Sequence, residues 1–149
     1  MSEDELLERA SDTVYQEMER VGGDPLKLPL VMQPIAILYT VQAMVDNGGF
    51  RYLFEGDFPF SPPYSAFAAA YREIGASDIA DLLERAVALF PFENPHLNSE
   101  GRNNYMDSLQ ESDPLFLLGD MVCGDERVWK LMEEYVKNHP EAFPNQNIQ

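Results

Sequence analysis

The stretch from residue 34 to residue 46 constrains the fold more than any other part of the chain. Drawn as a helix, it carries apolar side chains on almost every side, and Pro34 suits its first turn. A helix of that kind is normally central, because no side of it favours water. Asn47-Gly48-Gly49 should then end the helix, since both glycines accept positive φ. Residues 50–54 are expected to form a short helical turn, and other elements to pack around the buried helix.

Helical periodicity recurs along the rest of the chain. Leu7, Val14 and Met18 share one face of a first helix, expected over residues 3–21, and Gly22 can cap its end. Further helices are expected over residues 62–74, 78–90, 99–109, 114–122 and 126–139, with Ser61, Ser77 and Asp113 as N-caps. No segment alternates for long in the manner of a strand. We therefore expect an all-α protein: a single compact domain of six or seven helices over residues 1–149, with a frayed tail at 145–149.

Length, cysteine usage and hydropathy indicate one cytoplasmic domain. The chain has 149 residues, and its hydrophobic content of 45% is enough for a core. Cys123 is the only cysteine, so no intrachain disulfide forms, and the apolar run before it predicts a buried thiol. The first residues lack the order of a signal peptide, and the longest apolar stretch is too interrupted to span a bilayer.

The sequence offers little of what enzymes use. His96 and His139 are the only histidines, and His139 falls at a helix end, where a positive charge suits the helix dipole. Paired cysteines, His-Glu-x-x-His, Gly-x-Ser-x-Gly and a phosphate-binding loop are all absent from the sequence. We expect neither a metal nor a cofactor, and a protein that is not an enzyme.

Two carboxylates stand in apolar stretches of the sequence. Asp46 closes the central helix, and Asp120 interrupts the apolar run from residue 115 to residue 122. A carboxylate in such surroundings can be an acid with a raised pKa. The favoured interpretation is structural: the carboxylate accepts hydrogen bonds from backbone amides freed by the Gly48-Gly49 turn, or from Arg51.

Acidity is the strongest functional lead. The chain holds 26 Asp and Glu against 10 Lys and Arg, a net charge of −16. This balance excludes a bare nucleic-acid binder, which needs basic side chains to meet phosphates, and it argues against docking on an anionic membrane. Acids and bases are spread over both halves of the chain, so the charge belongs to the outer faces of ordered helices rather than to a tail.

Carboxylates at helical spacing form the candidate binding surface. The first row lies on one side of the first helix and consists of Glu5, Glu8, Asp12 and Glu19. The second row consists of Asp78, Asp81 and Glu84. Carboxylates three or four residues apart on a helix stand about 5–6 Å apart, close to the roughly 6–7 Å between phosphates along one DNA strand. Such a row can present charge to a DNA-binding protein as a phosphate backbone does. The alternative is an acidic face that only solvates the protein.

A short motif follows the central helix. Residues 41–50 read VQAMVDNGGF, and Tyr52-Leu53-Phe54 comes next; residues 73–76, 86–90, 118–120 and 135–143 add further segments in order. This pattern resembles a bacterial helical family, the DNA-mimic proteins, in which an Asn-Gly-Gly-Phe turn follows a hydrophobic helix. The resemblance covers residues 10–143. Tyr52 departs from the family pattern, which often has Gln at that place.

The resemblance implies an all-α domain, commonly dimeric, whose acidic surface imitates double-stranded DNA and occupies a helix-turn-helix transcription factor. The motif residues then have structural roles: the glycines make the turn, Phe50 anchors it in the core, and Asn47 caps or bonds locally. The residues assigned to this structural set are Asp46, Asn47, Gly48, Gly49, Phe50 and Asp120. Mimicry itself would rest on exposed carboxylates.

Three hypotheses follow from the sequence. The leading one is a non-enzymatic, homodimeric DNA mimic that sequesters a basic DNA-binding protein, a helix-turn-helix transcription factor, by electrostatic competition and without direct contact to nucleic acid. The alternative is an acidic interaction or immunity-like module that binds through an aromatic patch. That patch would consist of Tyr52, Phe58, Phe60 and Tyr64. The third is an enzyme that uses Asp46 or Asp120.

Overall fold

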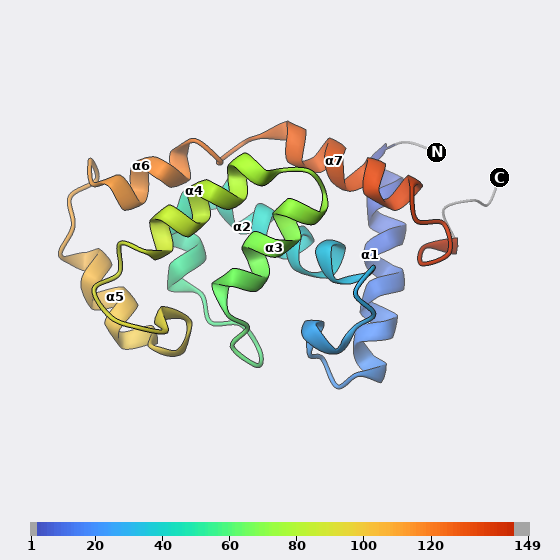
Figure 1. Cartoon of the computed structure of the whole chain (residues 1–149), viewed down its shortest axis with the longest axis horizontal. Coiled ribbons are helices and arrows are strands. Elements are labelled where there is room, and N and C mark those ends of the chain that lie inside the picture. Colours follow the sequence, from blue (N-terminus) through green and yellow to red (C-terminus); the bar gives the residue numbers. More distant parts are fainter. Residues whose placement is uncertain (1–2, 145–149) are drawn as a thin grey trace.

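Helix α2, Gln33–Glu55, lies at the centre of the structure (Figure 1). The computed structural model describes residues 3–144, and the tail expected to fray lies outside them. Ile35, Ala36, Ile37 and Leu38 are consecutive and all buried, so α2 is enclosed on more than one side, which confirms the prediction of a central helix. This helix packs against α1 (Glu3–Arg20), α3 (Tyr64–Glu73), α5 (Ser99–Asp107) and α6 (Pro114–Asp120).

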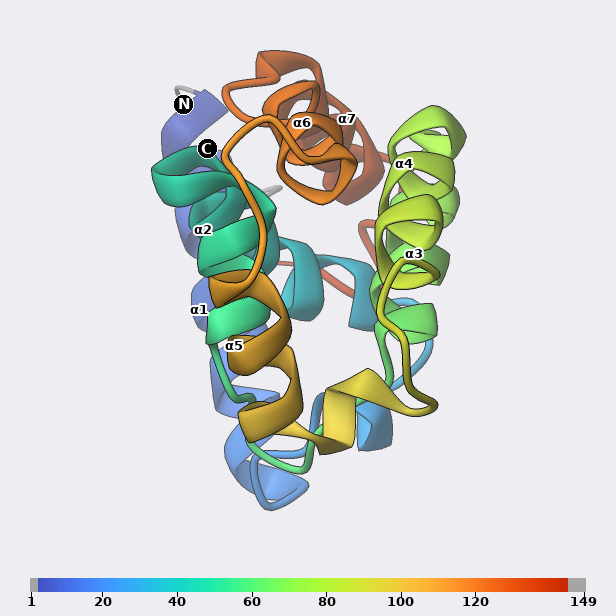
Figure 2. The ribbon, with the colours of Figure 1, turned by 90° about the vertical axis from the view of Figure 1, so that its left-hand side faces the viewer.

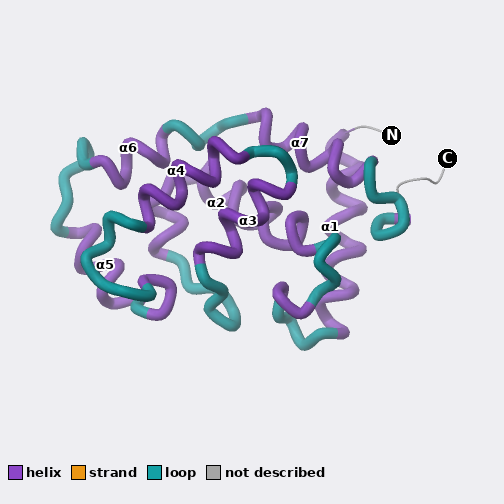
Figure 3. The backbone as a smooth tube through the Cα atoms, viewed as in Figure 1, coloured by secondary structure: helices purple, strands orange, loops and turns teal. Residues whose placement is uncertain are grey.

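The remaining elements are two helices and two short turns. α4 spans Ser77–Val87, α7 spans Glu126–Lys137, and the 3₁₀ turns η1 and η2 span Pro25–Lys27 and Pro95–Leu97. Residues 3–144 contain seven α-helices and no strand, which confirms the predicted all-α class (Figure 3). One continuous set of buried apolar side chains runs through all of them, so these residues form a single compact domain.

The helices lie in two layers. Figures 1 and 2 show α1, α2 and α5 on one side and the pair α3 and α4 on the other, with α6 and α7 running along the edge between them. The contacts agree with this view, because α3 packs on α2 and α4, α6 packs on α2 and α4, and α7 packs on α1. The core fills the space between the layers.

The Gly48-Gly49 step bends α2 rather than ending it. Gly48 (φ −164°, ψ 19°) and Gly49 (φ 65°, ψ −162°) leave the helical region, and the helix resumes at Phe50 and continues to Glu55. Only Gly49 needs a positive φ, so the prediction was wrong for Gly48, whose backbone is extended. Gly48 is required for another reason, since a Cβ there would stand 2.6 Å from that of Tyr52. Phe50 is buried, as predicted for the anchor of this turn.

Two predicted N-caps are wrong. α3 begins only at Tyr64, because Pro63 holds extended backbone (ψ 149°), and Ser61 stands outside the helix with φ 44°. α4 includes Ser77 as its first residue, and Ala76 occupies the N-cap position. Neither serine therefore occupies the N-cap position that its residue type favours.

Other helix ends differ by small shifts. Asp113 precedes α6 as predicted, but its carboxylate accepts a hydrogen bond from the backbone amide of Gln110 rather than from α6. α5, α6 and α7 each end two residues earlier than predicted. The amides just past these ends bond mainly to carbonyls three residues back, the tighter pattern that commonly closes a helix.

Arg102 fastens α5 to the end of α2. Its side chain is 1% exposed and donates hydrogen bonds to the carbonyls of Phe54 (2.8 Å), Gly56 (3.3 Å) and Pro95 (2.7 Å). It also pairs with the Asp57 carboxylate at 2.6 Å, which lowers the pKa of Asp57. The polar pattern of this segment predicts a peripheral helix, and it carries no signal for a buried cation.

We expect Gly119→Ala to destabilise the protein by about 1–3 kcal/mol through overpacking. A Cβ at Gly119 would stand 2.6 Å from the backbone nitrogen of Phe50, which cannot move aside without moving α2. The measurement is the urea midpoint at unchanged slope. Gly56→Ala is the matched control, because its Cβ would meet the terminal methyl of Met44, which can rotate away. Equal midpoints for the two variants would contradict this role of Gly119.

Candidate functional site

Four acidic side chains of α1 form a row along its outer side. This row, the α1 acidic row, consists of Glu5, Glu8, Asp12 and Glu19, all of which are exposed. The opposite side of α1 is fixed to the core by buried apolar side chains such as Leu7 and Val14. Within residues 3–144, Glu8, Asp12 and Glu19 form no ion pair. Their charges therefore lack a compensating basic partner, and the folded helix holds them at fixed spacing.

Tyr15 fills the gap in the α1 acidic row. It follows Asp12 by three residues and precedes Glu19 by four, which is the spacing of neighbours on one helix face. Its side chain is 46% exposed. Tyr15 is absent from the sequence prediction, which followed charge alone, although the spacing marks the same face. Because tyrosines are frequent anchors of protein interfaces, this face combines charge with an aromatic contact.

The second predicted row is compensated by arginines. Arg72 bonds the carboxylates of Asp81 (2.8 Å) and Glu84 (2.9 Å), and Arg127 bonds that of Asp78 (2.7 Å). The Arg127 guanidinium lowers the pKa of Asp78, and the Arg72 guanidinium lowers the pKa of Glu84. Asp78, Asp81 and Glu84 are therefore not a row of uncompensated charge, because arginines of α3 and α7 reach them.

Asp46 ties the central helix to the segment that joins α6 and α7. Its Oδ1 accepts hydrogen bonds from the backbone amide of Gly124 (2.8 Å) and from Gln42 Nε2 (2.8 Å). Its Oδ2 accepts one from Trp129 Nε1 at 2.9 Å. The carboxylate is half-buried, and both of its oxygens are used. This confirms the structural interpretation of Asp46 as a hydrogen-bond acceptor.

The partners of Asp46 are not the predicted ones. Among the hydrogen bonds of the described residues, none joins its carboxylate to the amides of Gly48 or Gly49. Arg51 instead pairs with Asp107 at 2.8 Å. Besides Gln42 on the same helix, the donors that reach Asp46 come from residues about eighty positions further along the chain, a proximity that only the fold creates.

A buried polar chain extends from Asp46 into the core. Gln42 is completely buried, and its Oε1 accepts a hydrogen bond from the Tyr71 hydroxyl at 2.7 Å. Burial raises the pKa of Tyr71, so the hydroxyl stays protonated and donates. Cys123 is exposed, which makes the prediction of a buried thiol wrong, because Val122 takes the core position in that turn. The Cys123 thiol donates to the backbone carbonyl of Asp46 at 3.4 Å.

The other motif residues lie at the surface of the bend. Asn47 is exposed and has no side-chain hydrogen bond within residues 3–144, so the predicted local cap is wrong. Asp120 is also exposed, rather than held in apolar surroundings. It borders a cavity of about 380 Å³ that is also lined by Gly48, Gly49, Phe50, Arg51, Glu111 and Phe116. Asp46 does not line this cavity, and the fold does not bring the two carboxylates into one site.

The four aromatics proposed as an alternative binding patch do not form one surface. Tyr52 and Phe60 are exposed, whereas Phe58 is half-buried against Phe67, with ring centroids 5.1 Å apart. Tyr64 belongs to the core, because the first turn of α3 faces inward there. The predicted patch is wrong as a set.

These features define the class of protein: an acidic, all-helical domain built on a central helix that bends at Asn-Gly-Gly-Phe. The chain matches the model of the DMP19-like protein family over residues 26–139 and belongs to that family. The match confirms the resemblance to the DNA-mimic proteins. It includes the bend and the second carboxylate row, and it leaves α1 outside. No curated protein and no solved structure gave a match. Over the residues that the structure describes, no helix is long and apolar enough to cross a membrane.

We expect Asp46→Ala to lower the free energy of unfolding by about 2–4 kcal/mol, because it leaves three donors without their acceptor. Trp129, the only tryptophan, reports the change directly, since its indole loses its hydrogen bond. The measurement is urea unfolding followed by tryptophan fluorescence. Asp120→Ala is the matched control and should be nearly neutral, as Asp120 is exposed. Equal losses in both variants would refute this structural role of Asp46.

Proposed function

We propose that the protein is a DNA mimic that sequesters a basic DNA-binding protein, a helix-turn-helix transcription factor, through the α1 acidic row. The observation that carries this proposal is a row of exposed carboxylates on one helix, of which Glu8, Asp12 and Glu19 form no ion pair with any described residue. Membership of the DMP19-like family supports the same activity.

The geometry of the α1 acidic row suits this role. Fourteen residues separate Glu5 from Glu19, which at 1.5 Å per residue is about 21 Å along the helix axis. That length equals the rise of about six phosphates on one DNA strand. A partner that tracks a phosphate backbone with Arg and Lys therefore meets charge over a comparable span. Tyr15 adds an apolar contact within the row.

Three further elements complete the proposal. The protein acts without catalysis, since Asp46 is held by three structural hydrogen bonds and Asp120 lies apart from it. It works in the cytoplasm, where a transcription factor is available. It is a homodimer, and exposed apolar side chains such as Leu30 (81%) and Phe60 (60%) are ones that a second copy can cover without charge repulsion.

The first test removes the charge of the α1 acidic row. We expect the variant with Glu5→Gln, Glu8→Gln, Asp12→Asn and Glu19→Gln to bind the partner about tenfold more weakly or worse, because complementary charge drives association. The partner is the DNA-binding protein captured by the wild-type protein from lysate of the source cells, and calorimetry gives its affinity.

A matched control separates this row from total charge. Glu93→Gln, Glu100→Gln, Glu111→Gln and Glu134→Gln together remove the same number of exposed carboxylates from other elements. We expect this variant to retain binding within about threefold of the wild type, as its charges lie outside the proposed contact. Equal losses in the two variants would show that net charge, and not α1, carries the interaction.

The second test concerns salt and DNA. We expect the captured partner to elute sharply in a salt gradient, because ions screen charge over about 10 Å at 0.1 M. We also expect duplex DNA to displace it, since mimic and DNA share one site on the partner. A partner that stays bound at high salt and is not displaced by DNA would contradict mimicry and favour an ordinary apolar interface.

A further inference from the structure

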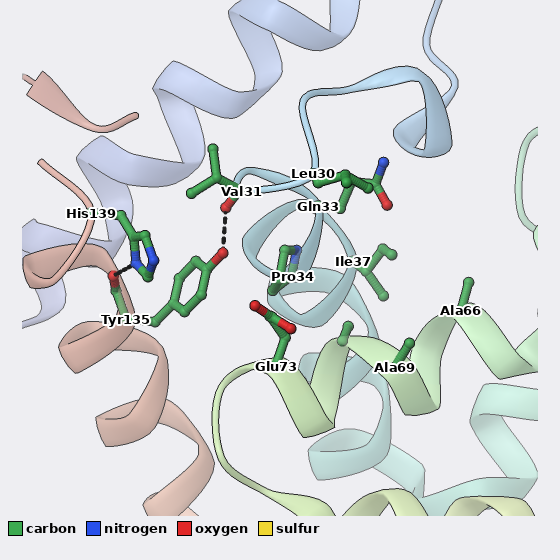
Figure 4. A pocket seen from close by; sticks show the side chains of 11 residues that line it. Leu30, Val31, Gln33, Pro34, Ile37, Ala66, Ala69, Glu73, Tyr135 and His139 are labelled. Atoms are coloured by element: carbon green, nitrogen blue, oxygen red, sulfur yellow. Dashed lines mark hydrogen bonds between the residues drawn. The ribbon is translucent and has the colours of Figure 1, made fainter. Parts of the chain in front are cut away.

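A second site is suggested by a cavity of about 390 Å³ between the start of α2, the outer side of α3 and the end of α7 (Figure 4). We call it the α2–α3–α7 pocket. Its walls are largely apolar, with Val31, Pro34 and Ile37 on one side and Ala66 and Ala69 on the other. Small side chains on α3 leave the space open, and the volume is that of a typical ligand-sized pocket.

The hydrogen-bond donors at this pocket are already used within the protein. The Tyr135 hydroxyl donates to the carbonyl of Val31 at 2.7 Å, and burial, with the charge of Glu73 nearby, raises the pKa of Tyr135 to about 12. Gln33 Nε2 donates to the carbonyls of Leu26 and Leu28. His139 Nδ1 lies 2.7 Å from the carbonyl of Tyr135, and because a carbonyl only accepts, this nitrogen carries the proton.

What remains at the pocket is a set of acceptors. Gln33 Oε1 has no partner within residues 3–144. An imidazole that carries its single proton on Nδ1 presents Nε2 as an acceptor. The Glu73 carboxylate forms no ion pair or hydrogen bond with the described residues. Figure 4 shows it reaching into the pocket between Pro34 and the Tyr135 ring. The Glu73 carboxylate therefore gives this largely apolar pocket one negative side that accepts hydrogen bonds.

We propose that the α2–α3–α7 pocket binds an arginine side chain of another protein. The aliphatic stem of arginine covers the apolar wall, and its guanidinium supplies donors to acceptors that lack them. A carboxylate or phosphate ligand would face Glu73 without a donor to meet it. An uncharged apolar group would offer the Glu73 carboxylate no hydrogen bond and no opposite charge. A guanidinium can also meet the two oxygens of the Glu73 carboxylate with two parallel N–H donors, a geometry that an ammonium does not match.

This inference goes beyond the proposed function and rests on other residues. The α1 acidic row contributes no side chain to the pocket, and the pocket contributes none to the row. The test below uses a small probe instead of the partner protein, so its outcome is independent of whether the protein mimics DNA.

The probe is N-acetyl-arginine amide, added to the ¹⁵N-labelled full chain and followed by amide chemical shifts. We expect saturable shifts at Ala66, Ala69 and Tyr135, with a dissociation constant on the order of 1 mM, as a ligand of this size allows. N-acetyl-citrulline amide has nearly the same shape without the charge, and it should bind at least about tenfold more weakly. Equal binding of the two probes would overturn the proposal, as would tighter binding of N-acetyl-lysine amide.

Substitutions at the pocket test where the arginine probe binds. Glu73→Gln should weaken binding of the arginine probe at least about tenfold, whereas Glu134→Gln, an exposed acid of α7 outside the pocket, should leave it unchanged. Ala69→Phe should abolish binding by filling the space, and because Ala69 is exposed the fold should persist, as circular dichroism would show. Full binding by Glu73→Gln, or by a folded Ala69→Phe variant, would refute the site.

Discussion

The bend of α2 at Gly48-Gly49 is the constraint on which the other helices depend. It turns Phe50 into the core and sets its backbone where only a glycine, Gly119, allows α6 to approach. Just before the bend, Asp46 holds the segment between α6 and α7 by its hydrogen bonds. Beyond the bend, Arg102 binds the last carbonyls of α2 and fixes α5. A straight helix would have a single axis against which its neighbours could pack. Because α2 is bent, its two segments have different axes and position two groups of helices independently.

The carboxylates of some helices are paired with cations and those of others are not, and the net charge of −16 does not show this difference. Arginines on α3 and α7 meet the carboxylates of α4, so a binding protein would have to break these ion pairs before using them. Along α1, no such pair with another described residue holds Glu8, Asp12 or Glu19. Two rows with the same spacing in the sequence therefore differ as binding surfaces, and the positions of a few cations decide which is available.

The sequence predicts what depends on neighbours along the chain. Apolar periodicity placed Leu7 and Val14 in the core, and the exposure of Asp12 follows from the same helical period. The sequence does not predict contacts between segments that meet only in the fold. The donation from Gly124 and Trp129 to Asp46, the burial of Arg102 and the pairing of Arg72 with Asp81 all depend on packing between elements. Helix ends were missed where prolines delay a helix, as at Tyr64, or where a last turn tightens.

Attraction and recognition make different demands on an acidic protein. Charges on an exposed helix act over about a Debye length and speed association, but they distinguish poorly between one basic partner and another. Discrimination requires contacts that only one partner completes, and these need a shaped, partly apolar site. The α1 acidic row has the first property, with Tyr15 as its one aromatic contact. The α2–α3–α7 pocket has the second, because the Glu73 carboxylate adds a charged acceptor to a largely apolar cavity. Separating the two lets the surface charge vary without altering what the pocket selects.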